Sequence, residues 1–185
     1  MEKFYRLEAK NANNSVAYLF NNEISNQKAI EFFTSGLPPE KPLKLKHISG
    51  KRWPDFLTRM HVILPFVSEK FIKTIEECGL TGWKKYEIEI ENKPQEIETN
   101  YFGFLITGQC DNNLKTISKE MKLKNWDGLD FFYMRDTATI FLSEKAFNCL
   151  NKKKEKLTNL DLEDFENYLL YHIDSSAYFK KKFNF

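Results

Sequence analysis

The pattern of hydrophobic and polar positions indicates several β-strands along the chain. Residues 3–8 and 16–20 are rich in aromatic and β-branched side chains, and residues 43–48 alternate between apolar and polar positions. Residues 101–107, with the sequence YFGFLIT, form a strongly apolar strand candidate. The segment 35–42 contains three prolines and a glycine, so we expect it to be an irregular connector.

The middle of the chain predicts a strand–helix–strand unit over residues 53–90. An apolar run at residues 62–67 indicates a buried strand, and Ser68 follows as the expected helix N-cap. One helical stripe is then formed by Phe71, Ile72, Ile75 and Cys78. Gly79 is placed as a C-cap glycine would be, and residues 83–90 alternate as a second strand.

The same unit recurs 75 residues further along, over about residues 128–150. Six of 21 aligned positions are identical: Asp55, Phe56, Phe66, Ser68, Glu69 and Lys70 correspond to Asp130, Phe131, Phe141, Ser143, Glu144 and Lys145. Two copies are too few for a solenoid, so we interpret residues 1–185 as one pseudo-duplicated domain. Two independent domains are the alternative. Strands outnumber helices without strict alternation, which favours the α+β class.

The sequence after the second copy predicts a C-terminal amphipathic helix. A basic run at residues 151–156 is followed by a capping-box pattern at residues 158–161. One helical face then collects Leu162, Phe165, Leu169 and His172. Pointing elsewhere are the acidic residues Asp161, Glu163, Asp164 and Glu166. These four form either a solvated helix face or an anionic patch that meets a basic partner.

Composition narrows the class of protein. The 185 residues are 42% hydrophobic, 29% charged and 15% aromatic, which is typical of a globular chain with a sizeable core. A net charge of +2 provides no one-signed field for nucleic acid or anionic lipid, and the longest apolar run has six residues, too short for a membrane span. We therefore expect a cytoplasmic protein whose three cysteines (Cys78, Cys110 and Cys149) are reduced and packed as small apolar side chains.

Motifs for catalysis are missing from the sequence. The glycines form no phosphate-binding loop, no serine has a nucleophile-elbow context, and neither histidines nor cysteines have metal-ligand spacing. We expect no enzymatic activity, cofactor or metal. Lysines interleave with aromatics at residues 83–86 and 179–183, so a nucleic-acid-binding module is one alternative. A small-ligand-binding module, or a small enzyme using a pairing such as Cys78–His61, is the other.

The order of several short motifs resembles immunity family eleven of the bacterial polymorphic-toxin systems. The motifs are FYRLE near the start, Trp53-Pro54-Asp55-Phe56, Val67-Ser68-Glu69-Lys70, Gly79-Leu80-Thr81-Gly82, YFGFLITGQCDNN from residue 101, and the run from Thr137 to Lys145. The resemblance covers about residues 3–150. It implies a cytoplasmic antidote, alone or in a heterodimer with its toxin, that binds the toxin domain tightly and occludes it or locks it inactive, without catalysis.

The chain departs from that resemblance after Leu150. The resemblance implies a second glycine-containing helix end and closing strand, where this chain has a basic run and the expected acidic helix. We therefore expect partner specificity at Asp161, Glu163, Asp164 and Glu166. Candidate aromatic anchors for the same interface are Trp53, Trp83 and Trp126, although tryptophan is as often a core residue.

Overall fold

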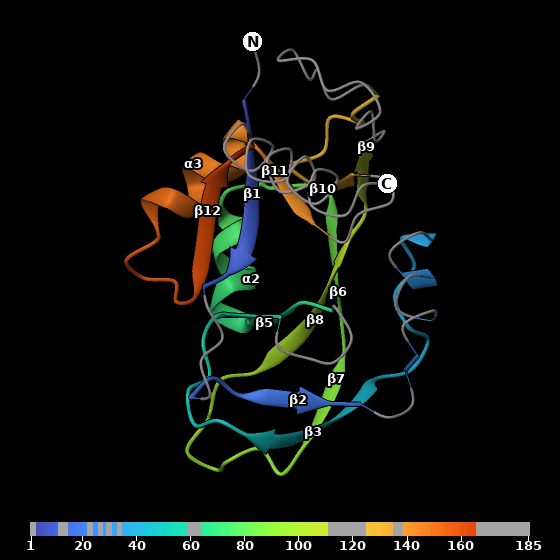
Figure 1. The fold of residues 1–185 in the computed structure, drawn as a ribbon, viewed down its shortest axis with the longest axis vertical. Helices are drawn as coiled ribbons and strands as arrows, with labels where there is room; N and C mark the ends of the chain where they lie inside the picture. Colours follow the sequence, from blue (N-terminus) through green and yellow to red (C-terminus); the bar gives the residue numbers. More distant parts are fainter. Residues whose placement is uncertain are drawn as a thin grey trace, which may run out of the picture.

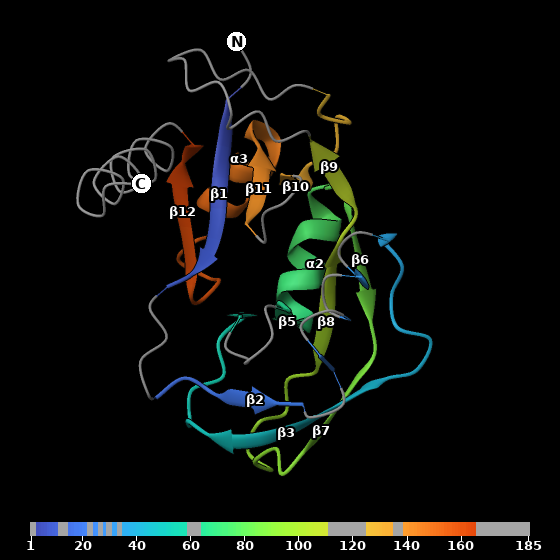
Figure 2. The same cartoon turned by 45° about the vertical axis from the view of Figure 1, so that its right-hand side comes forward.

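Three β-sheets and two nine-residue helices are the principal elements in the described part of the chain in the computed structural model (Figure 1, Figure 2). The structure describes residues 3–10, 15–21, 24–25, 28, 31–32, 35–58, 64–110, 125–134 and 139–165. The strands are β1 (Phe4–Ala9), β2 (Tyr18–Phe20), β3 (Leu43–Ser49), β4 (Phe56–Leu57), β5 (Phe66–Ser68), β6 (Trp83–Tyr86), β7 (Ile88–Glu91), β8 (Tyr101–Ile106), β9 (Gly108–Cys110), β10 (Phe131–Met134), β11 (Ile140–Ser143) and β12 (Leu160–Asp164). The helices are α2 (Glu69–Glu77) and α3 (Glu144–Lys152). The α+β class is confirmed.

Both helices begin at the serines that the sequence indicates. The Oγ of Ser68 accepts a hydrogen bond from the backbone N–H of Phe71 at 3.1 Å. Ser143 does the same for Ala146 at 3.2 Å. Each bond satisfies one of the amide groups that the first helical turn leaves without an internal partner. Gly79 follows the C-cap of α2 with φ of 57°, a left-handed conformation that suits glycine.

The duplication predicted from the sequence is present in the sheets. The four-stranded sheet has the order β4-β5-β8-β6, and the five-stranded sheet repeats it as β10-β11-β1-β12, with β9 beyond β10. Registers agree as well, because Phe56 lies opposite Val67 while Phe131, 75 residues later, lies opposite Leu142. We call β4, β5, α2, β6 and β8 the first repeat, and β10, β11, α3, β12 and β1 the second repeat.

The second repeat takes its third strand from the other end of the chain. In the first repeat β8 lies between β5 and β6, and the equivalent place between β11 and β12 is taken by β1. Figure 1 shows this blue strand beside the red β12. Tyr5 lies opposite both Leu142 and Asp164 in the two flanking ladders. β1, from the N-terminal part of the chain, is therefore an interior strand in the sheet of the second repeat.

The prediction of an amphipathic helix from residue 158 onward is wrong for its first part. Residues 160–164 form β12, which pairs antiparallel with β1. Leu160 is 1% exposed and lies in the main core, so the alternation of Leu160 and Leu162 serves a strand. The second repeat thus extends to Asp164, beyond the predicted end at residue 150, and includes a closing strand. The rest of the predicted helix, from residue 166, lies outside the described residues.

The main core is shared by both repeats, which supports one domain. Its buried members come from both helices and from the strands of both sheets: Leu7, Phe56, Phe71, Ile75, Phe104, Phe131, Leu142 and Leu150 are examples. A second cluster joins the three-stranded sheet, of order β2-β3-β7, to the first repeat. The single strand predicted over residues 83–90 divides at Glu87, because Tyr86 pairs with β8 whereas Ile88 pairs with Leu43 in β3.

The prediction of three reduced cysteines is contradicted for two of them. Cys78, the C-cap of α2, forms a disulfide with Cys149 of α3, with their Cα atoms 6.4 Å apart. Cys110 forms no disulfide and is buried, as expected. The pairing escaped the sequence analysis because 71 residues separate the two partners. Only the packing of one helix against the other brings them together.

The repeat symmetry predicts a second place where a disulfide can form. An offset of 75 residues maps Cys78 onto Lys153 and Cys149 onto Thr74, and the C-caps Cys78 and Lys153 have similar ψ angles of −3° and 7°. In a Cys78→Ser/Cys149→Ser background, we expect Thr74→Cys/Lys153→Cys to form the disulfide spontaneously in air. Intact mass spectrometry should show that the variant is lighter by two hydrogens than its reduced form. The pair Thr74→Cys/Lys152→Cys is the matched control and should stay reduced; equal oxidation of both pairs would contradict the equivalence.

Candidate partner-binding face

Two buried aspartates connect the repeats through reciprocal hydrogen bonds. Asp55 accepts bonds from the backbone N–H and the hydroxyl of Thr158 in the second repeat, at 2.8 and 3.0 Å. Asp130 accepts the same two bonds from Thr81 in the first repeat, at 2.9 and 3.0 Å. We call Asp55–Thr158 and Asp130–Thr81 the two aspartate latches. Each carboxylate is satisfied by a threonine from the other repeat.

The remaining contacts of the two aspartates are also equivalent. In each, the second carboxylate oxygen accepts a 2.6 Å bond from the hydroxyl of the serine that caps the helix of its own repeat. The Nζ of Lys70 lies 3.6 Å from Asp55, and that of Lys145 lies 3.4 Å from Asp130. The carboxylate oxygens are therefore occupied by structural donors. This arrangement holds the repeats together and does not present an acid or base for chemistry.

The ionisation of Asp130 reflects these contacts. Burial by itself would raise the pKa of Asp130. Hydrogen bonds from Ser143 and Thr81, together with the charge of Lys145, outweigh burial and lower that pKa below its ordinary value. The folded state therefore favours the ionised carboxylate.

A charged face lies on the side of the second repeat that points away from the main core. Arg6 of β1 forms ion pairs with Glu163 of β12 at 2.8 Å and with Glu8 at 3.1 Å. Asp161 lies directly opposite Glu8 in the β1–β12 ladder and is exposed. We call Glu8, Asp161 and Glu163 around Arg6 the acidic face. Three carboxylates face one guanidinium there, so its net charge is negative.

The equivalent face of the first repeat is apolar and covered. Through the two ladders, Gly103 and Leu105 of β8 occupy the places of Arg6 and Glu8 in β1. Leu105 and Tyr86 belong to the cluster that packs against the three-stranded sheet. A Cβ on Gly103 would lie 1.9 Å from the ring of Tyr86, so glycine is required for this ring to lie flat on β8. The first repeat docks a sheet on this side. The second repeat carries there the acidic face, along β1 and β12, and beside it a third hydrophobic cluster of Cys110, Phe132, Phe141 and Phe165.

The predicted acidic residues are thus only partly brought together. Asp161 and Glu163 share the acidic face, whereas Asp164 lies opposite Tyr5 on the other side of the strand. Burial first, and then the negative charges of Glu144 and Asp164, raise the pKa of Tyr5. Glu166 lies outside the described residues. Sequence analysis missed Glu8, because nothing local indicates that β1 pairs with β12.

The three predicted tryptophan anchors do not form one patch. Trp53 is partly buried against the second cluster, with its ring centroid 5.4 Å from that of Tyr101. Trp83 packs on the main core and donates its indole N–H to the carbonyl of Leu80 at 2.8 Å. Trp126 packs on a third cluster. Each therefore supports a different part of the core, although each is partly exposed.

Two other surface features offer less for a ligand. Tyr86, in the lysine–aromatic segment at residues 83–86, is buried, so its ring cannot stack on a nucleic-acid base. An open groove of about 510 Å³ runs beside α2, but its Lys73 pairs with Glu69 at 2.9 Å and its Lys153 with Glu77 at 2.6 Å. These ion pairs neutralise much of the positive charge in the groove.

Several further observations bear on the class of protein. Across the described residues, no helix is long and apolar enough to cross a bilayer. In the same ranges, no group of three or more histidine, cysteine, aspartate or glutamate side chains is arranged to hold a metal ion. The chain matches no protein-family model and no curated protein. Its resemblance to immunity family eleven therefore stays a prediction from motif order.

The aspartate latches predict a pH-dependent contribution to stability. Asp130→Asn should lower the free energy of unfolding at pH 7 by about 2–3 kcal/mol, because it removes a buried charged acceptor of several hydrogen bonds. The pKa of Asp130 is lower in the folded than in the unfolded protein, so the contribution is present at neutral pH and is lost as the pH falls below about 4. The difference between the two proteins should shrink accordingly.

Urea unfolding at pH 7, 5 and 3 measures this difference. The matched control is Glu76→Gln, which removes an exposed carboxylate from α2. It should change stability by less than about 0.5 kcal/mol at each pH. A destabilisation by Asp130→Asn that stayed constant across the three pH values would show that the ionised carboxylate is not the stabilising form.

Proposed function

We propose that the protein is an immunity protein that binds a toxin domain and neutralises it by covering its active surface, without catalysis. The acidic face is the observation that carries the proposal. It lies along β1 and β12, beside the third hydrophobic cluster, on the side of the second repeat whose counterpart in the first repeat packs against another sheet. The order of motifs over residues 3–150, which resembles immunity family eleven, supports the same function.

Charge complementarity provides the mechanism of recognition. An excess of carboxylates at Glu8, Asp161 and Glu163 attracts a basic surface on the toxin and orients it during encounter. Glu163 is held in place by Arg6, so its carboxylate is positioned before binding. The complex is a heterodimer of one antidote and one toxin domain, formed in the cytoplasm.

Capture from the native host tests the proposal most directly. A tagged protein should retain one large, modular protein at near one-to-one ratio through its C-terminal region, identified by mass spectrometry. Purified complex should lack the activity of that region, and release of the antidote should restore it. Recovery of background proteins alone, from cells that express the candidate toxins, contradicts the proposed function.

The contribution of the acidic face is measured with the captured partner. Glu8→Lys/Asp161→Lys should slow association by at least about tenfold at low salt, because it reverses the field that attracts a basic surface. The matched control, Glu76→Lys/Glu91→Lys, makes the same charge change on exposed residues of α2 and β7. It should slow association far less. Equal effects from both double variants would place the toxin contact elsewhere on the molecule.

A further inference from the structure

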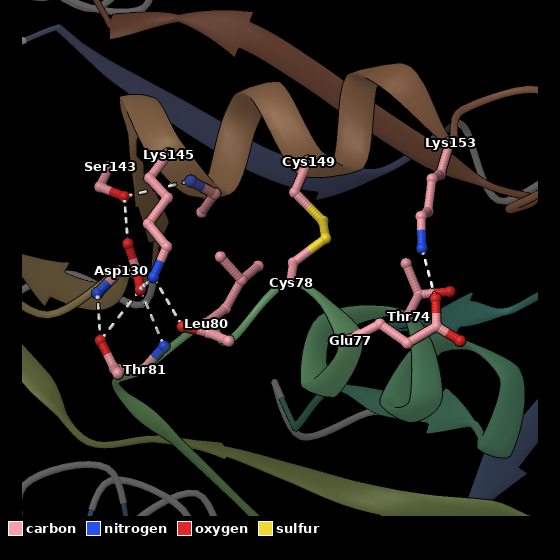
Figure 3. Close-up of a disulfide and its surroundings, with 12 residues drawn as sticks. Thr74, Glu77, Cys78, Leu80, Thr81, Asp130, Ser143, Lys145, Cys149 and Lys153 are labelled. Carbon is pink, nitrogen blue, oxygen red and sulfur yellow. Dashed lines mark hydrogen bonds and ion pairs between the residues drawn. A yellow bond between two sulfur atoms is a disulfide. The ribbon is translucent and has the colours of Figure 1, made fainter.

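The Cys78–Cys149 disulfide crosses the interface between the two helices (Figure 3). We propose that it is a redox-responsive staple, which forms and breaks within a fold that both states share. Both cysteines are only partly buried, so small thiols and disulfides reach them from solvent. The third cysteine, Cys110, is 2% exposed and is protected from exchange. Exposure as well as position therefore favours the pairing of Cys78 with Cys149 over a pairing of either with Cys110.

Non-covalent contacts on both sides of the disulfide hold the helices without it. On one side the Nζ of Lys145 donates to the carbonyl of Gly79 at 2.6 Å, next to the Asp130–Thr81 latch. On the other side Lys153 and Glu77 form an ion pair at 2.6 Å. Figure 3 shows Lys145 on one side of the two sulfur atoms and Lys153 with Glu77 on the other. These contacts keep the cysteines close after reduction, which makes ring closure an intramolecular step.

The repeat symmetry allows the two ends of the α2–α3 helix pair to be compared with each other. The places of Cys78 and Cys149 correspond to Lys153 and Thr74 at the opposite end of the helix pair, where no cysteine is present. Thr74 and Lys153 line one groove beside α2, and the Lys153–Glu77 ion pair joins the two helices there without a covalent bond. The disulfide is therefore an addition to a helix pair that the latches and the core already position.

The exchange step uses a low-molecular-weight disulfide such as oxidised glutathione. The thiolate of one cysteine attacks that disulfide and releases one reduced thiol. The thiolate of the second cysteine then attacks the mixed disulfide, forms the Cys78–Cys149 bond and releases a second reduced thiol. Two protein thiols are thus oxidised while one disulfide is reduced to two thiols. A reducing compartment reverses both steps.

Oxidation should stabilise the fold by restricting the unfolded chain. The bond closes a loop with a sequence separation of 71, which links the end of α2 to α3 across β6 to β11. A loop of that length lowers the unfolding equilibrium constant by about a thousandfold in the chain-entropy account. The protein is accordingly folded in a reducing compartment and becomes more resistant to unfolding in an oxidising one. This inference does not depend on the proposed function.

The test compares the full-length protein after equilibration with dithiothreitol and with oxidised glutathione. Alkylation and intact mass spectrometry should count three free thiols in the reduced protein and one in the oxidised protein. Urea unfolding should give an equilibrium constant about a thousandfold smaller after oxidation. Circular dichroism and amide NMR spectra should show the same fold in both states, with shifts confined to α2 and α3.

Two variants make the result specific. Cys78→Ser/Cys149→Ser should fold like the reduced protein and show no dependence on redox conditions. Cys110→Ser, the matched single substitution, should retain the full dependence. Loss of the native spectra on reduction of the wild type would overturn the proposal, because the bond would then be required for folding. Equal unfolding constants for both redox states would overturn it as well.

Discussion

Burying a carboxylate is costly unless hydrogen bonds replace its water, and this requirement couples the two halves of the protein. Asp55 and Asp130 each lie at the start of a repeat, yet each takes two hydrogen bonds from a threonine of the other repeat. Each repeat therefore hydrogen-bonds one carboxylate oxygen of its aspartate through its own capping serine and depends on the other repeat for the second oxygen. The shared hydrophobic core fills the space between the latches, so the duplicated unit folds as one domain.

The equivalence of the two repeats continues beyond the latches, in backbone hydrogen bonds within each repeat. Gly82 and Asn159, which follow the two latch threonines, both have positive φ angles, of 85° and 70°. The carbonyl of Gly82 accepts a bond from Thr107, and that of Asn159 accepts the equivalent bond from Lys10. The second repeat thus reproduces the helix-to-strand connection with two extra residues and with asparagine in place of glycine. Asparagine is the residue that best replaces glycine in this conformation.

The two repeats differ at residues outside the shared core, and the candidate functional features lie at those residues. Leu105 and Tyr86 of the first repeat pack under a sheet, whereas Glu8 and Glu163 at the equivalent places are charged. One end of the helix pair carries a disulfide, and the other carries an ion pair. The two repeats share the residues that hydrogen-bond buried groups, and they differ at positions that make no such bond. The acidic face and the disulfide are both of the second kind.

The sequence by itself determined the features that depend on neighbouring residues: the strands over residues 3–8, 43–48 and 101–107, the serine caps and the 75-residue repeat. Only the tertiary structure decided which distant segments pair or pack with these elements. The segment LDLED fits a helix as well as a strand by pattern, and pairing with β1 makes it a strand. The same pairing places Glu8 beside Asp161, and helix packing joins Cys78 to Cys149. Such contacts connect residues far apart in the chain, so no local preference or spacing specifies them.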